Sequence, residues 1–232
     1  LELVSPPPTH HPSGAGKTSL LYLTIAYAIL PANFAPSIVL EGQDAAVVLF
    51  DPLSHFSVAR LAEVMLNLLI SKIQGTGRDL DEATKATMRS LVRRSLLHVH
   101  IFRPQSWGSL ISALRSLPDY LFDQTRHKSM HRRIHSIILE DIDAFTWSIR
   151  SSPSSSLAST TTSNLLSVAS NNLTTQLTKL STLFSCAKIL TSHSMSPSAF
   201  RPVLPTSWPQ GSAVTRLAIR RVEVLKFAPA IS

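Results

Sequence analysis

Apolar blocks alternate with segments of helical periodicity along most of this chain. Short apolar runs bounded by polar or turn residues are typical of buried strands, and they occur at residues 1–4, 45–51, 98–104 and 135–141. Longer segments with apolar residues at every third or fourth position predict helices at residues 18–30, 57–73, 81–97 and 106–122. This alternation predicts an α/β fold, with a mainly parallel sheet and helices on both of its faces.

Proline and a change of composition interrupt the pattern. Pro118 lies inside the 106–122 segment and predicts a break in that helix, while Asp81 is expected to cap the preceding helix. Residues 151–164 are rich in Ser and Thr and nearly free of charge, which predicts a flexible loop. A strand is expected at 186–194 and a β-rich end at 213–227. We expect one domain over residues 1–232.

Between the loop and the 186–194 strand, a helical stripe is expected. It consists of Leu166, Ala169, Leu173, Leu177, Leu180 and Phe184.

The segment after the first strand carries half of a phosphate-binding loop. Counting back from Gly16-Lys17-Thr18, His11 occupies the place of the first Gly in G-x-x-x-x-G-K-[ST]. The second half is intact: small residues let backbone N–H groups surround a polyphosphate, Lys17 can reach its outer phosphates, and the Thr18 hydroxyl can bind Mg²⁺. A Gly-rich helix N-terminus that binds nothing is the alternative. The predicted nucleotide-binding residues are Ser13, Gly14, Ala15, Gly16, Lys17, Thr18 and Ser19.

A carboxylate partner for this loop is expected at the end of the 135–141 strand. A phosphate-binding loop needs an acid at the end of another strand to hold Mg²⁺ or its water shell. Glu140 follows the apolar residues 137–139, so we predict that Thr18 and Glu140 hold the metal ion. Asp141 is the competing candidate for this metal ligand. The alternative is that Glu140 is a solvated acid at a strand end and binds no metal.

Charge and composition add less to the picture. The net charge of +8 and the isoelectric point of about 10.2 favour an acidic partner such as nucleic acid without identifying one. A single cysteine, Cys186, excludes an intrachain disulfide and is expected to be a buried, inert thiol. No uninterrupted apolar run reaches about 20 residues, so we expect a soluble protein of a reducing, intracellular compartment.

Two further groups of side chains, one basic and one aromatic, could contact nucleic acid. The basic run at residues 126–135 is interpreted as a solvated loop or helix end, with contact to DNA phosphates as the alternative. Trp107, Trp147 and Trp208 are expected to pack in the core or under a lid rather than to stack on bases.

Three segments, taken in order, resemble the RecA-like recombination ATPases. They are "SGAGKTSLLYL" (13–23), "VVLFDPLSHFSVARL" (47–61) and "IILEDIDAFTW" (137–147). The stretches at 50–56 and 143–147 are most similar to the eukaryotic recombinase paralogues of the X-ray-repair cross-complementing protein two group. The resemblance implies a RecA-like fold, ATP and Mg²⁺ as cofactors, a nuclear location, and repair of DNA double-strand breaks by homologous recombination in complex with other paralogues.

The chain departs from that family where ATP is hydrolysed. Active recombinases place Thr and a catalytic Glu after the strand that ends here at Asp51, and this chain has Pro52 and Leu53. Leucine cannot accept a proton, so we expect slow ATP turnover or none, with Asp141 as the remaining candidate base. The position of the family's γ-phosphate-sensing Gln matches His193.

The alternatives to a recombinase paralogue are a P-loop ATPase or kinase of another class, and a scaffold that binds no nucleotide. For the chain alone, we expect weak, sequence-independent DNA binding and no membrane association. The surfaces expected to bind partner proteins are the helix carrying Leu166, Leu173 and Leu180, and the terminal strand at 213–224.

Overall fold

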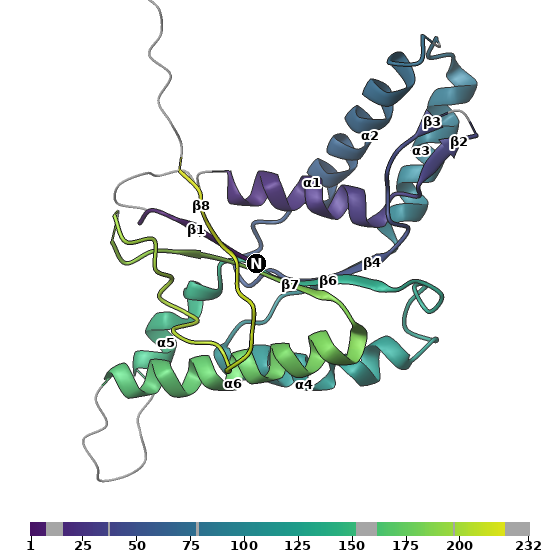
Figure 1. Ribbon diagram of the computed structural model, residues 1–232. Helices are drawn as coiled ribbons and strands as arrows, with labels where there is room; N and C mark the ends of the chain where they lie inside the picture. The colour runs from purple at the N-terminus through teal and green to yellow at the C-terminus, as the bar shows by residue number, and fades with distance from the viewer. Residues whose placement is uncertain (8–15, 37, 78, 152–161, 197, 221–232) are drawn as a thin grey trace, which may run out of the picture.

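A parallel sheet of six strands forms the centre of the molecule. The computed structural model describes residues 1–7, 16–36, 38–77, 79–151, 162–196 and 198–220. The order of the strands in the sheet is β5-β4-β6-β7-β1-β8 (Figure 1). Every pairing between neighbours in this sheet is parallel. The strands are β1 (Glu2–Ser5), β4 (Ala46–Phe50), β5 (Val99–Phe102), β6 (Ile134–Leu139), β7 (Ala187–His193) and β8 (Arg216–Ala218).

Helices cover both faces of this sheet (Figure 1). One face packs against α1 (Lys17–Ile29), α2 (Val58–Gln74) and α3 (Glu82–Leu96). The other packs against α4 (Trp107–Phe122), α5 (Thr146–Ser151) and α6 (Thr162–Phe184). The two-residue period of a strand explains the division, because Val47 and Leu49 join the first core and Val48 and Phe50 join the second. The predicted α/β class is therefore confirmed.

Smaller elements connect these layers. A two-stranded antiparallel pair, β2 (Asn33–Ala35) and β3 (Ile38–Val39), follows α1. A short 3₁₀ helix, η1 (Ile142–Phe145), follows β6 and leads into α5. Within the described residues, no helix combines the length and the apolar character that crossing a bilayer requires.

The cap predicted for α3 is present, whereas the break predicted in α4 is not. Asp81 caps α3 as predicted, since its carboxylate accepts a hydrogen bond from the Thr84 backbone N–H at 2.8 Å. The break predicted at Pro118 is wrong, because α4 continues through it. Leu117 and Leu121 are buried on either side of the proline, and their packing holds the helix together despite the missing N–H.

Helix α6 starts earlier than the composition suggested. It begins at Thr162, so the last part of the predicted 151–164 loop is helical, and residues 152–161 lie outside the described part of the chain. The predicted stripe is confirmed as core: Leu173 and Leu177 are fully buried and Phe184 is half-buried. The sheet and α4 cover the buried residues of this stripe, so binding of a partner through α6 would have to use its exposed side, and it stays a prediction.

The β-rich end is described only in part. Strand β8 spans Arg216–Ala218 and pairs with β1, while residues 221–232 lie outside the described residues. The terminal strand as a partner-binding surface consequently stays a prediction.

The opposite environments of two residues on α6 generate a test of this packing. Leu173→Ala should lower the free energy of unfolding by about 2–5 kcal/mol, because Leu173 is fully buried and its removal leaves a cavity. Val168→Ala, on the same helix but 68% exposed, should change it by less than about 0.5 kcal/mol. Urea unfolding of both variants measures this difference, and equal effects would contradict the burial of the stripe.

Candidate functional site

The carboxyl ends of four parallel strands bring the predicted residues together at one edge of the sheet. β7 lies between β1 and β6, and α1 begins at the same edge, close behind the end of β1. Gly16 precedes α1 with φ of 92°, a left-handed conformation that favours glycine over any residue with a side chain. Ser13, Gly14 and Ala15 lie outside the described residues. Ser19 is exposed on the first turn of α1 and has no described part in the site.

Lys17 is buried where the ends of β1 and β7 meet. Its side chain is 2% exposed, and Nζ donates hydrogen bonds to Ser5 Oγ at 2.7 Å and to the Ser192 carbonyl at 3.0 Å. Asp141 Oδ1 lies 3.9 Å from the same nitrogen. Burial lowers the pKa of Lys17, and the carboxylates of Asp141, Asp143 and Glu140 oppose that shift. The ammonium group is thus held in an acidic corner of the sheet edge.

Thr18 and Glu140 meet as predicted. Thr18 Oγ1 donates a hydrogen bond to Glu140 Oε1 at 2.8 Å, although 122 residues separate them in the chain. Glu140 is 1% exposed and its second oxygen, Oε2, has no hydrogen-bond partner among the described residues. Burial raises the pKa of Glu140 to about 7, against the lowering effect of the Thr18 hydrogen bond. A hydroxyl beside a desolvated carboxylate oxygen is a donor set that suits Mg²⁺.

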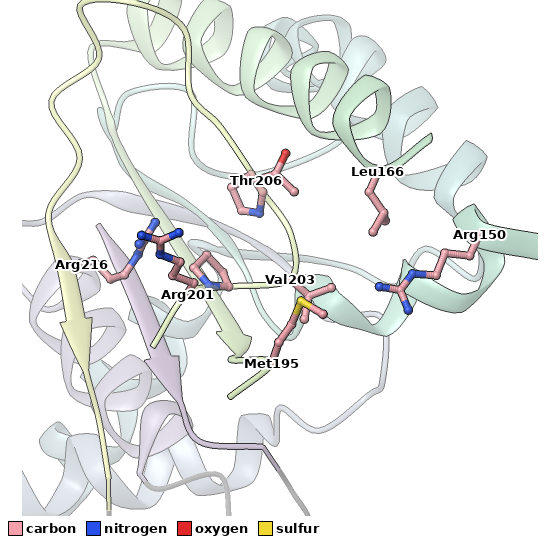
Figure 2. A pocket seen from close by; sticks show the side chains of 9 residues that line it. Arg150, Leu166, Met195, Arg201, Val203, Thr206 and Arg216 are labelled. Atoms are coloured by element: carbon pink, nitrogen blue, oxygen red, sulfur yellow. The ribbon is translucent and has the colours of Figure 1, made fainter. Parts of the chain in front are cut away.

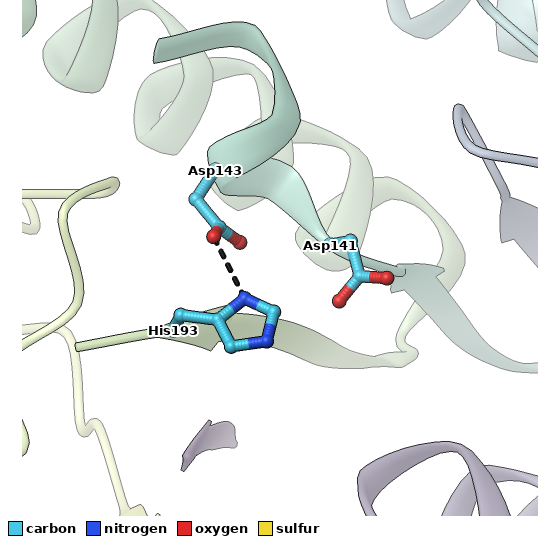
Figure 3. Close-up of side chains that lie close together, drawn as sticks. All are labelled: Asp141, Asp143 and His193. Atoms are coloured by element: carbon cyan, nitrogen blue, oxygen red, sulfur yellow. Dashed lines mark hydrogen bonds and ion pairs between the residues drawn. The ribbon is translucent and has the colours of Figure 1, made fainter. Parts of the chain in front are cut away.

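A second cluster of potential ligands lies beside this pair. Asp141, Asp143 and His193 each offer one ligand atom, all within 4.8 Å of one another (Figure 3). His193 Nδ1 and Asp143 Oδ2 are 2.9 Å apart, and Asp143 Oδ1 is buried without a hydrogen-bond partner in the described structure. His193 is the last residue of β7 and thus stands at the same sheet edge. Two carboxylates and an imidazole could bind a divalent cation, although Lys17 already supplies positive charge to Asp141.

The sequence interpretation missed His55. Its Nδ1 lies 3.1 Å from Asp141 Oδ2, and its imidazole is 58% exposed. The Asp51 carboxylate fixes the loop after β4, since it accepts hydrogen bonds from the backbone N–H groups of His55 and Phe56. The sequence shows Asp51 at a strand end with His55 four residues later, but it does not show that His55 contacts Asp141. Asp141, the predicted candidate base, is therefore paired with both His55 and Lys17.

The other aromatic and sulfur predictions have mixed outcomes. Cys186 is buried, and burial raises the pKa of its thiol to about 11, as expected for an inert cysteine. Trp107 packs edge-on against Phe145, and Trp208 Nε1 donates a hydrogen bond to Glu2 at 2.6 Å. Trp147 is 78% exposed, so the expectation that it packs in the core is wrong. It lies on the short helix α5, whose buried face uses Thr146 and Ile149 instead.

Much of the basic run at 126–135 has a structural role. Arg132 reaches Asp44 at 2.6 Å and the Ile29 carbonyl at 3.1 Å, and Arg133 hydrogen-bonds Gln43. These contacts tie the segment before β6 to the segment before β4. The interpretation as a solvated loop holds only in part: residues 126–133 are turns and irregular chain, but residues 134–135 begin β6 and the side chain of Arg132 is only 19% exposed.

A scan against models of known protein families found no match, and a search of curated proteins found no significantly similar sequence. The candidate site is thus defined by the contacts among its own side chains.

The pKa of Glu140 leads to a prediction about stability without divalent metal. Between about pH 4.3 and about pH 7 the folded protein keeps a proton on Glu140 that the unfolded chain has released, so its free energy of unfolding falls as pH rises. Glutamine at this position cannot titrate, so Glu140→Gln removes this pH dependence. As pH rises across that window, the free energy of unfolding of the parent should fall by on the order of 1–3 kcal/mol more than that of the variant. Urea unfolding at about pH 5 and about pH 8 measures it. Parallel pH profiles of the two proteins would contradict the assigned shift.

Proposed function

We propose that this chain is an ATP-binding recombinase paralogue that acts in homologous-recombination repair of DNA, in a nuclear complex with other paralogues. The observation that carries the nucleotide part is the contact of Thr18 Oγ1 with Glu140 Oε1 at 2.8 Å. It joins the start of α1 to the end of β6, the pairing that a phosphate-binding loop and its acidic strand require. The parallel sheet with helices on both faces agrees with the fold that the resemblance implies.

The chemistry of the corner supports a nucleotide with Mg²⁺. Lys17 is desolvated and bound to neutral acceptors, Ser5 and Ser192, which it can exchange for phosphate oxygens without losing hydrogen bonds. The unpartnered Oε2 of Glu140 and the Thr18 hydroxyl are the groups that would hold the metal. Bound Mg²⁺ would neutralise charge on the phosphates. Phosphate binding would also give Lys17 an anionic partner in addition to Asp141.

Slow turnover is part of the proposal. Leu53 is 47% exposed beside the site and cannot accept a proton. The carboxylate oxygens of Asp141 are already engaged, Oδ1 by Lys17 and Oδ2 by His55, so neither oxygen is free to accept a proton from the attacking water. His55 is the exposed group with an acceptor nitrogen at this edge, and Asp141 orients its ring. ATP therefore acts mainly as a structural or switching ligand in this proposal.

Two other functions use the same residues differently. A P-loop ATPase or kinase of another class would turn ATP over at an ordinary rate, and a scaffold would not bind it. DNA binding by the chain alone is proposed to be weak and to fall steeply with salt, since the support for it is a net charge of +8.

A substitution of Lys17 tests nucleotide binding. Lys17→Ala should weaken Mg·ATP binding about 10–100-fold, because it removes the charged donor expected to face the phosphates. Lys85→Ala, which removes an exposed lysine paired with Glu82 on α3, should leave binding unchanged. Calorimetric titration with and without Mg²⁺ measures both, and thermal unfolding checks that the variants fold. Failure of the parent to bind ATP would favour the scaffold, and full binding by Lys17→Ala would refute the loop assignment.

The missing general base leads to a separate prediction about rate. Purified chain should hydrolyse ATP about 10²–10⁴-fold more slowly than an active recombinase, the range that general-base assistance supplies. His55→Ala should reduce the residual rate further, whereas Leu53→Ala should not change it, because leucine has no proton acceptor. Single-turnover assays with radiolabelled ATP can measure such rates. An ordinary rate that persists in both His55→Ala and Asp141→Asn would rule out the slow-turnover proposal.

A further inference from the structure

A pocket of about 660 Å³ lies between α5, the start of α6 and the chain that joins β7 to β8. Its volume is within the range of roughly 300–1,000 Å³ that is usual for ligand-binding sites. Figure 2 shows Arg150 at one end and Arg201 and Arg216 at the other, with Met195 and Val203 between them. None of the residues discussed for the nucleotide site lines this pocket.

The charge of this pocket is strongly positive. Three arginines, Arg150, Arg201 and Arg216, line it, and the described lining includes no acidic residue. Arg216 Nε is 2.7 Å from Glu2 Oε2, so one of these charges is compensated. Arg150 and Arg201 form no ion pair or side-chain hydrogen bond with any described residue. An occupant with negative charge is therefore favoured.

The space between the arginines is apolar. Leu166 is 8% exposed and forms the inner wall, whereas Met195 is 69% exposed. The remaining lining includes Val203 and two prolines, and no aromatic side chain is among the described lining residues. Proteins that bind single-stranded nucleic acid usually stack its bases on aromatic rings, so this lining fits an aliphatic side chain better than a base.

Hydrogen bonds hold the outer wall in place. Ser170 Oγ on α6 accepts from the backbone N–H groups of Thr206 at 2.8 Å and Ser207 at 3.2 Å. An isolated antiparallel bridge joins Ser194 and Pro202 on the other side. Because the loop is fastened at both places, the pocket is formed before a ligand arrives, which reduces the entropic cost of binding.

We propose that this pocket binds an acidic segment of a partner protein. An aliphatic side chain of that segment inserts between Leu166, Met195 and Val203, and flanking carboxylates pair with Arg150 and Arg201. The proposed site shares no residue with the phosphate-binding corner, so the proposal does not rest on nucleotide binding. It therefore stands as a protein-docking site whether or not nucleotide binds.

The test measures binding of the full chain to a short fluorescein-labelled peptide in which leucines are flanked by glutamates, at about 0.15 M salt. Matched probes carry serine in place of leucine, or lysine in place of glutamate, and a labelled oligothymidylate represents nucleic acid. The pocket variant is Arg150→Glu with Arg201→Glu, and Arg216 is kept because it pairs with Glu2. The control variant, Arg89→Glu with Arg93→Glu, makes the same charge change at exposed positions of α3.

The leucine–glutamate peptide should bind the parent and the control alike, and about tenfold more weakly to the pocket variant. Met195→Asp, at a position that is 69% exposed, should weaken binding as well, and thermal unfolding checks that this variant folds. Equal binding of the serine probe would show charge attraction without a pocket and would overturn the proposal. The proposal would also be overturned if the parent did not bind the peptide, or if the pocket variant bound it as tightly as the parent. If the pocket variant lost only the binding of oligothymidylate, the surface would be assigned to nucleic acid instead.

Discussion

The buried ammonium group of Lys17 is the point on which the arrangement of the sheet edge depends. It connects the end of β1, through Ser5, to the end of β7, through Ser192, and it faces the acids that follow β6. A charge that is 2% exposed is costly unless hydrogen bonds and opposite charge compensate it. The surrounding acids provide that compensation, so the position of each acidic side chain is linked to the position of this lysine.

The acids that surround Lys17 outnumber it, and this excess of negative charge suits the binding of a metal ion together with an anion. Asp51, Glu140 and Asp141 are all buried near one another, and the pKa of Glu140 is raised first by its burial and then by both acidic neighbours. A divalent cation at Glu140 would relieve that repulsion, and phosphate would then find Lys17 and the start of α1 within reach. Structure, metal and nucleotide are thus coupled in the proposed function through one set of charges.

Positive charge is distributed differently. Arg132 and Arg133 hold the segment before β6 against the segment before β4, so part of the net charge of +8 stabilises the fold. Arg150 and Arg201, by contrast, border an apolar pocket without compensating acids in the described structure. The basic run at residues 126–135 is therefore the weaker candidate for binding an acidic partner. Arg150 and Arg201, which lie outside any basic run, are the stronger candidates.

Local patterns in the sequence determined the strands of the six-stranded sheet, most helices and the half-loop at Gly16-Lys17-Thr18, because period and capping are short-range properties. They did not predict the small antiparallel pair of β2 and β3. They were also sufficient to predict that Thr18 and Glu140 meet, since parallel strands end at a common edge. The tertiary structure alone decided that Pro118 stays inside α4, that the stripe of α6 is core, and that Trp147 is exposed. It alone placed His55 against Asp141 and gathered three distant arginines around one pocket. These outcomes depend on which faces of the elements meet, and no single segment of the sequence contains that information.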